Sequence, residues 1–453
     1  MGPTTDELHF PAGFLWGAAT SAHQVEGGNR GNDWWRFEQQ PGTIRGGARS
    51  GEACQHFERF DEDFALAESD GHSAHRLSFE WSRLEPTPGQ FAAEAIAHYH
   101  AVLASLREHR LIPVVTLHHF TNPLWLADAG GWEDRRAVDH FERFVRFCAR
   151  EFGSEVDWWC TVNEPEVYAF RSYSEGVWPP GVRDDSRALG VMANLLEAHG
   201  RAYRVLHAED RVDADGDGQA ARVGFAKHRV CLAPLRAWNP LDHVLSYFEN
   251  RMFNTAVERA AFDGVIDLGI PGARGVRREL PELKGALDWY GLNHYTRWMV
   301  KSLAPDPHVL RPGAPANDLG WELYPEGFER ALVQTSRLGR PVLVTENGFA
   351  DAHDRLRPQA LIDHLVAMHR AIGQGADVLG YLHWSLLDNF EWAEGYHGCF
   401  GLYGVDFAHP LRPRTRRRSA EVFARIARAN AITSAVREAA RMDPRLDLGP
   451  TLD

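Results

Sequence analysis

The 453-residue sequence has few cysteines and no excess of positive charge, and each shortage excludes a class of protein. The five cysteines form no Cys-x-x-Cys pair, which argues against a zinc ribbon and against a thioredoxin-like motif. An odd number of scattered cysteines is typical of a reducing compartment, so we expect a cytoplasmic protein. The net charge of −13 argues against a nucleic-acid partner, because binding phosphates needs clustered positive charge.

Long apolar segments are also missing. The first ten residues have neither the basic segment nor the apolar stretch of a signal peptide. No run approaches the ~18 apolar residues that a membrane span requires. The sequence contains no internal repeat and no low-complexity linker. We therefore expect no membrane association.

The residues that are present fit a large globular protein. A hydrophobic fraction of 44% and a charged fraction of 25% are ordinary for a chain that buries a sizeable core. The 15 tryptophans are more than composition alone explains. Their flat faces suit core packing, and they also suit stacking on the apolar faces of sugar rings.

Short apolar runs alternate with longer amphipathic stretches, which is the pattern of β/α units. The predicted strands are 14–18, 74–79, 112–117, 156–162, 222–226, 287–292, 341–345 and 378–382. The clearest helical periodicity lies in 92–108, 137–152, 188–208, 243–261 and 358–373. This rhythm predicts an α/β fold, a single (β/α)8 barrel over residues 1–453, with a closing helix and tail after about Arg428.

Two glutamates directly follow predicted strands. Glu164 lies in Thr-Val-Asn-Glu-Pro, which ends at Pro165, and Glu346 lies in Val-Thr-Glu-Asn-Gly, which ends at Gly348. In such a barrel the reactive groups gather at the C-terminal ends of the strands. Cleavage of a glycosidic bond needs one carboxylic acid to protonate the leaving oxygen and one carboxylate at the anomeric carbon. The pair therefore predicts a glycosidase, although an isolated Asn-Glu-Pro is more often an ordinary loop or helix cap.

Several longer motifs accompany the two glutamates and follow one another in a fixed order. They are Phe-Leu-Trp-Gly-Ala-Ala-Thr-Ser from Phe14, His-Gln-Val-Glu-Gly from His23, Arg-Leu-Ser-Phe-Glu-Trp-Ser-Arg from Arg76 and Trp-Ser-Leu-Leu-Asp-Asn-Phe-Glu-Trp from Trp384. With these motifs the sequence resembles the family 1 glycoside hydrolases from Phe10 to about Ser419. That family includes β-glucosidases and β-galactosidases.

The resemblance implies a role for each matching residue. Glu164 matches the acid/base and Glu346 the nucleophile of a retaining reaction through a covalent glycosyl-enzyme. Arg76 and Tyr295 match residues that contact the nucleophile. Substrate-binding positions are matched by Gln24, His119, Asn163, Asn293, Tyr295, Trp384, Glu391 and Trp392. The implied partner is a β-glucoside or a short β-linked oligosaccharide, and neither a cofactor nor a metal is expected.

Two positions depart from the family pattern, and two informative ones keep it. Phe120 replaces a common tryptophan, and His294 stands where tyrosine is common. Relatives that act on 6-phosphosugars lack the carboxylate that Glu391 supplies, and thioglucosidase relatives carry glutamine where Glu164 stands. The sequence therefore predicts a β-glucosidase acting on unphosphorylated O-glycosides, with β-galactosidase or β-fucosidase side activity.

Structural interpretations compete with the functional one at single residues. Without its motif, Arg76 inside an apolar strand is best explained as the partner of a core carboxylate such as Glu80. Trp384 alone fits plain core packing. Tyr295 and Asn293 alone fit a turn after a strand. The clustering of the motifs favours the site.

Three further features suggest other functions. Residues 213–218 resemble the first half of a calcium loop, but Gly224 stands where a bidentate glutamate should close it, so we expect a polar surface loop. The basic run 412–418 is interpreted as a solvated face. A metal-dependent barrel hydrolase using His118 or His119 is one rival function, and a catalytically silent sugar-binding protein is another.

Overall fold

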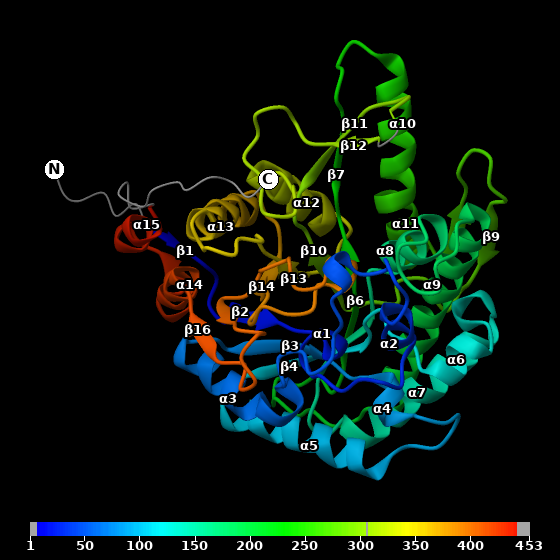
Figure 1. The fold of residues 1–453 in the computed structure, drawn as a ribbon, viewed down its shortest axis with the longest axis horizontal. Coiled ribbons are helices and arrows are strands. Elements are labelled where there is room, and N and C mark those ends of the chain that lie inside the picture. Colours follow the sequence, from blue (N-terminus) through cyan, green and yellow to red (C-terminus); the bar gives the residue numbers. More distant parts are fainter. Residues whose placement is uncertain (1–6, 305–306, 442–453) are drawn as a thin grey trace.

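The computed structural model describes residues 7–304 and 307–441, and eight parallel strands close a barrel at its centre (Figure 1). All the predicted strands are present, with ends that differ by one or two residues. In chain order the barrel strands are β2 (Leu15–Ala19), β3 (Ala74–Ser78), β4 (Ile112–His118), β5 (Trp158–Asn163), β6 (Arg222–His228), β10 (Trp289–Asn293), β13 (Val342–Asn347) and β14 (Val378–Trp384). The barrel closes where β10 pairs with both β6 and β13. The predicted (β/α)8 barrel is confirmed.

Large side chains fill the barrel near the starts of the strands. Trp158 and Trp289, the first residues of β5 and β10, have ring centroids 5.9 Å apart. A Cβ on Gly224 would lie 2.5 Å from the Trp289 carbonyl oxygen, so only glycine fits beside that strand. Because this end is a packed core, the buried polar side chains of the strands gather toward the opposite end, the barrel mouth.

Amphipathic helices cover the outside of the barrel. The helix α7 shows why: its buried residues Ala137, Phe141, Phe144, Cys148 and Phe152 recur every three or four positions and face the strands. The covering helices are α3 (His56–Ser69), α5 (Ala93–Glu108), α7 (Arg136–Phe152), α9 (Asp185–Glu209), α11 (Ala256–Asp263), α12 (Pro325–Ser336), α13 (Arg357–Gly373) and α14 (Arg418–Ala429). Shorter helices in the loops are α1 (Ala22–Val25), α2 (Asp33–Glu38), α4 (Trp81–Leu84), α6 (Leu124–Asp128) and α8 (Pro165–Ala169).

The helix expected over residues 243–261 contains a π-helical turn. The structure has α10 (Pro240–Asn250), a π turn at Arg251–Thr255 and then α11. Asn254 in this turn donates to the Val230 carbonyl oxygen at 2.9 Å. A π turn adds a residue to the helical repeat, so periodicity alone could not locate it.

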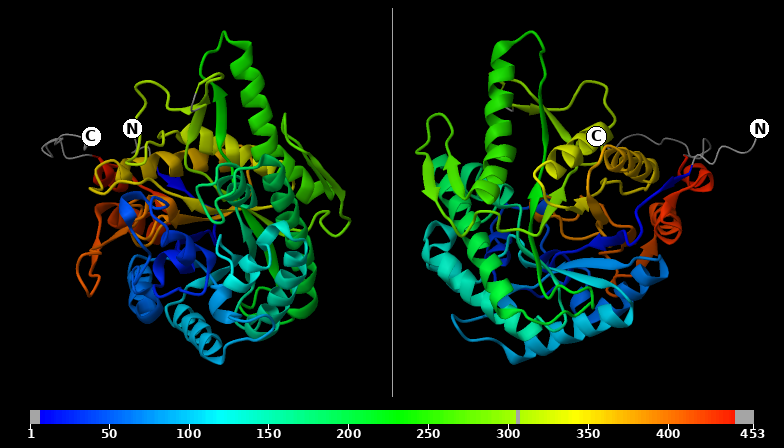
Figure 2. Two further views of the ribbon diagram at one scale, coloured as in Figure 1. Left: turned by 45° about the vertical axis from the view of Figure 1, so that its right-hand side comes forward. Right: turned by 180° about the vertical axis from the view of Figure 1, so that it is seen from behind.

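An arm projects from the barrel beside α12 (Figures 1 and 2). It comprises β7 (Cys231–Pro234), α10, β11 (Arg297–Val300) and β12 (His308–Val309), and β11 pairs with both other strands. A separate hairpin, β8 (Val265–Leu268) with β9 (Val276–Glu279), packs beside α9. Among the described residues, no helix has the length and apolar character that crossing a bilayer demands.

The C-terminal segment pairs with the N-terminal segment outside the barrel sheet. After α14 comes β17 (Ala431–Ile432), which pairs with β1 (Leu8–His9), and then α15 (Ser434–Ala440). A helix thus follows Arg428 as expected, as α15, and the expected tail from 442 lies outside the described residues.

The interpretation of residues 412–418 as a solvated face is wrong for Arg414 and Arg417, whose side chains are largely buried, whereas Arg416 is exposed. Three arginines of this run, in and beside the hairpin β15 (Tyr403–Val405) and β16 (Arg414–Arg416), bind buried aspartates. The pairs are Arg414 with Asp63, Arg416 with Asp70, and Arg417 with Asp388. The partners lie far away in the sequence, so charge density alone could not reveal them.

Candidate active site

The carboxylate of Glu346, near the end of β13, is held by a cation and a hydroxyl. Arg76 from β3 donates through Nη1 to Oε1, and the Tyr295 hydroxyl donates to Oε2 at 2.7 Å. Arg76 is fully buried. Burial disfavours its charged form, yet the neighbouring Glu346 carboxylate raises the pKa of Arg76 above its usual value. The attraction between Arg76 and Glu346 therefore offsets the cost of burying the two charges inside the barrel.

Arg76 does not pair with Glu80, so the structural alternative considered for Arg76 is wrong. The Glu80 carboxylate instead accepts from the Ser82 hydroxyl at 2.6 Å and from the Thr121 hydroxyl at 3.0 Å. Glu80 thus begins the helix α4, whereas Arg76 points into the barrel mouth.

Glu164, directly after β5, has an uncommon backbone conformation. Its φ of 44° and ψ of 63° lie in the left-handed region, which is strained for a residue with a side chain. Its N–H donates to the Ala226 carbonyl oxygen on β6 at 2.7 Å, and Pro165 begins α8 immediately afterwards. The strand, the tight turn and the proline together fix where the Glu164 carboxyl lies.

The Glu164 carboxyl is poised to hold a proton. It accepts a hydrogen bond from Asn293 Nδ2 at 2.7 Å. Burial and then the negative charge of Glu346 raise the pKa of Glu164 well above its usual value. A neutral acid therefore faces a carboxylate that is paired with Arg76.

A chain of amide groups connects the two glutamates. Arg76 Nη2 donates to Asn163 Oδ1 at 2.7 Å, and Asn293 Nδ2 donates to the same oxygen at 3.2 Å. Asn293 also contacts Glu164, so residues from β3, β5, β10 and β13 form one connected polar set. Side chains from four separate strands meet here, as expected for a barrel active site.

A second set of hydrogen-bonded polar side chains involves the segment after β14. Gln24 Nε2 donates to Asn389 Oδ1 at 2.9 Å and to Glu391 Oε2 at 3.3 Å. Burial and the charge of Glu346 raise the pKa of Glu391 to about 8. Asn389 was not among the predicted site residues, although it lies inside the motif that begins at Trp384 and could have been found there.

Aromatic rings form a wall around His119. Its ring stacks at 17° on Trp384 and on Trp392, with centroids 6.0 Å and 6.1 Å away. Its Nε2 atom lies 3.3 Å from Asn163 Nδ2. Burial and then the charge of Arg76 hold the pKa of His119 well below its usual value, so the ring is neutral. Every predicted site residue thus lies at the barrel mouth.

The two departures from the family pattern have different surroundings. Phe120 packs on Trp178 and Trp392, with centroids 4.8 Å and 5.3 Å away, and so belongs to the aromatic wall. The His294 ring instead stacks on Phe328 at 5.6 Å, with Nδ1 2.6 Å from a backbone carbonyl oxygen. Phe120 can therefore influence the site directly, whereas His294 faces the surrounding core.

The loop that resembles a calcium site lies at the opposite end of the barrel. Carboxylate oxygens of Asp157, Asp213 and Asp215 lie within 4.8 Å of one another, and the latter two residues are exposed. Asp213 accepts from the N–H groups of Gly216 and Gly218 at 2.7 Å and 2.8 Å. These carboxylates are thus engaged in shaping their own loop.

Comparison with known proteins identifies the family of the chain. The Glycosyl hydrolase family 1 profile matches residues 6–432. The β-galactosidase of Pyrococcus woesei is 31% identical over 95% of this chain and 99% of its own length. For β-glucosidase A of Thermotoga maritima the values are 32%, 89% and 94%.

Solved structures give the same result. The β-glycosidase from Pyrococcus horikoshii superimposes with a TM-score of 0.86, at 35% identity over 97% of this chain and 99% of that one. The Thermotoga maritima β-glucosidase in complex with glucoimidazole gives 0.83, at 31% identity over 94% of this chain and 100% of that one. The profile match and the relatives span nearly the whole chain, and the chain is a member of glycoside hydrolase family 1.

Proposed function

We propose that the protein is a retaining β-glycosidase, with β-glucosidase as its main activity, that hydrolyses terminal non-reducing unphosphorylated β-D-glycosides. The observation that carries the proposal is that two buried carboxyl groups differ in their tendency to hold a proton. Glu346 is paired with Arg76, while burial and the charge of Glu346 raise the pKa of Glu164. Double displacement needs such an acid and such a nucleophile.

In the first step Glu164 transfers its proton to the glycosidic oxygen while a Glu346 carboxylate oxygen attacks the anomeric carbon. The bond between that carbon and the glycosidic oxygen breaks, and the aglycone leaves as an alcohol. Arg76 and the Tyr295 hydroxyl hold the attacking carboxylate in place. The product is a glycosyl ester of Glu346 with inverted configuration.

In the second step water attacks the anomeric carbon from the face that the aglycone left. The Glu164 carboxylate, now without its proton, takes one from this water, and the bond to Glu346 breaks. Two inversions give net retention, so the first sugar released is the β anomer.

We assign the sugar-binding roles from the resemblance to the family. Asn163, which contacts Arg76 and lies near His119, is assigned to the 2-hydroxyl. The 3-, 4- and 6-hydroxyls are assigned to Gln24, His119, Glu391 and Trp392, with Trp384 as the floor and Asn293 as a polar wall. Amides, an imidazole and a carboxyl group offer both donors and acceptors, which a polyol requires.

A free hydroxyl fits beside Glu391 better than a phosphate. The pKa of Glu391 is about 8 because burial and the Glu346 charge both disfavour a further negative charge there. A 6-phosphate would bring about two negative charges to the same place. This supports an unphosphorylated glycone.

The test is turnover of p-nitrophenyl β-glucoside, β-galactoside and β-fucoside by the chain and by Glu346→Ala. We expect the highest kcat/KM with the glucoside and no turnover by the variant. A higher kcat/KM with the galactoside would reverse the choice of glycone. A chelator should leave the rate unchanged, whereas inhibition by it would favour the metal-dependent rival.

We further propose that residues 1–453 act as one cytoplasmic domain. All five cysteines are free, which suits a reducing compartment. The pairing of β1 with β17 ties the two ends of the described chain to the same barrel. Limited proteolysis that released a stable fragment would argue against a single domain.

A further inference from the structure

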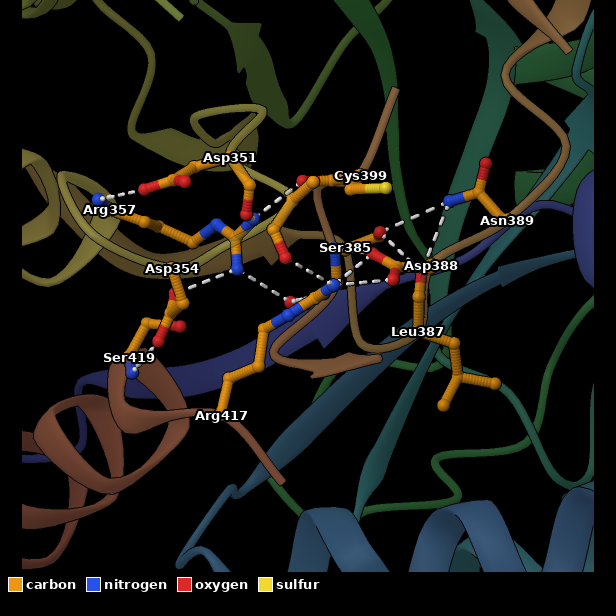
Figure 3. A network of polar contacts seen from close by, with 12 residues as sticks. Asp351, Asp354, Arg357, Ser385, Leu387, Asp388, Asn389, Cys399, Arg417 and Ser419 are labelled. Atoms are coloured by element: carbon orange, nitrogen blue, oxygen red, sulfur yellow. Dashed lines mark hydrogen bonds and ion pairs between the residues drawn. The ribbon is translucent and has the colours of Figure 1, made fainter. Parts of the chain in front are cut away.

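Arg357 is a fully buried arginine that uses all of its donors on the loops above the barrel (Figure 3). It begins α13, and a guanidinium group offers five N–H donors. They reach the carbonyl oxygens of Phe349 at 2.8 Å, Gly401 at 2.9 Å and Cys399 at 2.5 Å, the carbonyl oxygen of Asp351, and Asp354 Oδ1 at 2.8 Å. Four of the five acceptors are therefore backbone carbonyls.

These four carbonyls belong to two different loops. Phe349 and Asp351 lie in the loop that leaves β13 directly after Glu346. Cys399 and Gly401 lie in the loop that leaves β14 and carries Glu391 and Trp392. One guanidinium thus connects the loop of the proposed nucleophile to the loop of the proposed sugar-binding residues.

Arg417 makes a second connection between the same loops. It binds both carboxylate oxygens of Asp388 at 2.7 Å and the Gly401 carbonyl oxygen at 2.7 Å, and it reaches the Ala352 carbonyl oxygen at 3.4 Å. Asp388 also accepts from the Gly401 N–H at 2.9 Å. The Gly401 carbonyl oxygen is therefore shared by two guanidinium groups.

The two loops also touch through their backbones. A Cβ on Gly348, in the loop after β13, would lie 1.9 Å from the carbonyl oxygen of Trp384, the last residue of β14. Within the loop after β14, a Cβ on Gly401 would lie 2.1 Å from the Asp388 nitrogen. Beyond Asp388, Asn389 accepts from Gln24 at 2.9 Å, which extends the connection to the sugar-binding side. Contacts this close leave no room for a side chain at Gly348 or at Gly401.

We propose that Arg357 and Arg417 are positioning residues that set the distance between Glu346 and the glycone-binding residues Glu391 and Trp384. The proposal rests on the roles assigned above to those three residues. Neither arginine belongs to the polar chain between Glu164 and Glu346, so each acts through the loops that it holds. A misplacement of about 1 Å between a bound substrate and its catalytic group can lower the rate about 100-fold.

The chain contains a matched control for Arg417. Arg414, in the same segment, also binds both carboxylate oxygens of one buried aspartate, Asp63 at 2.8 Å and 2.9 Å. It also binds two backbone carbonyl oxygens, those of Arg412 at 2.7 Å and Cys54 at 2.8 Å. Arg414 and Arg417 thus make the same kinds of bonds, but only Arg417 joins the two loops of the site.

The experiment compares Arg417→Lys with Arg414→Lys. Lysine keeps the charge but lacks the planar fork that holds a carboxylate and two carbonyls together. We expect both variants to lower Tm by similar amounts. Arg417→Lys should lower kcat/KM for p-nitrophenyl β-glucoside by about 10-fold to 100-fold, mainly through kcat. Arg414→Lys should stay within about twofold of the parent, because Arg414 bonds to Asp63, Arg412 and Cys54 and to neither loop of the site.

Inhibitor binding gives a readout that does not depend on turnover. The Ki of glucoimidazole should rise with Arg417→Lys by about the factor lost in kcat/KM, because interactions made in the transition state are the ones disturbed. The Ki of the product glucose should change less. Equal effects of Arg417→Lys and Arg414→Lys on kcat/KM and on glucoimidazole binding would overturn the proposal.

Further variants keep the test of the two arginines interpretable if Arg417→Lys fails to fold or if the assigned roles are wrong. If Arg417→Lys does not fold, Asp388→Asn with its match Asp63→Asn makes the same comparison. If Glu346→Ala keeps its turnover, the assigned roles are wrong and the inference falls with them. If Glu346→Ala is inactive while the paired variants behave alike, only the inference about Arg417 is wrong.

Discussion

The two ends of the barrel both gather buried acids with raised pKa values, yet they are built differently. At the mouth, burial and the charge of Glu346 raise the pKa of Glu391 to about 8, and Glu164 is raised well above its usual value. At the base, burial raises the pKa of Asp157 to about 6 and that of Asp210 to about 7. A raised pKa alone therefore does not distinguish the two ends.

The partners of the acids distinguish them. Asp157 accepts from the N–H groups of Ala214 and Asp215 at 2.9 Å and 2.6 Å, and Asp210 accepts from the Trp159 indole at 2.9 Å. At the base each acid shapes its own neighbourhood, whereas at the mouth the side chains of four strands contact one another. We expect catalysis at the end of the barrel where side chains of separate strands converge, and a contribution to folding stability at the end where they do not.

The sharpest contrast between the ends should come from removing one carboxylate at each. Glu346→Ala leaves no group to attack the anomeric carbon, so kcat should fall by about 10⁴-fold or more. Asp157→Asn at the base should leave kcat within about twofold, because it contacts no part of the site. Steady-state kinetics with p-nitrophenyl β-glucoside checks both. A rate for Glu346→Ala near that of the parent would remove the distinction between the ends.

Removing the acid should have an effect that depends on the leaving group. Glu164→Ala should barely slow glycosylation by a dinitrophenyl glucoside, which needs no proton, but should slow an alkyl glucoside about 10²-fold to 10⁴-fold. Azide needs no base, so it should rescue Glu164→Ala and yield the β-glycosyl azide. Proton NMR of the product gives the anomer. Equal losses for both substrates, or an α azide, would contradict the assignment.

A smaller contrast comes from two tyrosines that each donate to a carboxylate. Tyr295 donates to Glu346 at 2.7 Å at the mouth, and Tyr203 donates to Asp288 at 2.9 Å at the base. A hydrogen bond to a charged group contributes about 1.5–3 kcal/mol, so Tyr295→Phe should lower kcat/KM about 10-fold to 100-fold. Tyr203→Phe should leave it unchanged. Similar losses in both variants would show that Tyr295 acts only on stability.

The contrast with the smallest expected effect on the rate is a pH-dependent change in stability at the base. The folded pKa of Asp210, about 7, lies above the unfolded value of about 3.9, so the folded state binds this proton more tightly. Its contribution is complete below pH ~4 and is lost as the pH rises through about 7. Asp210→Asn should therefore gain Tm relative to the parent between pH 4 and pH 8. Parallel Tm curves would contradict the raised pKa.

Much of the fold and of the candidate site could be predicted because its signals are local. Alternating apolar runs located the strands, and short motifs located Glu164, Glu346 and the residues near Trp384 that lie at the barrel mouth. The bonds of Arg357 and Arg417 could not be predicted, because their acceptors are mostly backbone carbonyls, which carry no sequence signal. Asp388 is 29 positions before Arg417, and a run of arginines is usually solvated.

The left-handed backbone at Glu164 bears on how this enzyme can be made more heat-stable. Glycine adopts a φ of 44° without strain, and burying an acid there also opposes folding. Glu164→Gly is therefore expected to lose most of its activity on alkyl glucosides and yet to survive heating as well as the parent or better. A library screened by heat alone would accumulate such impaired variants. Directed evolution of this chain should screen turnover after heating, and should place its diversity at the barrel base.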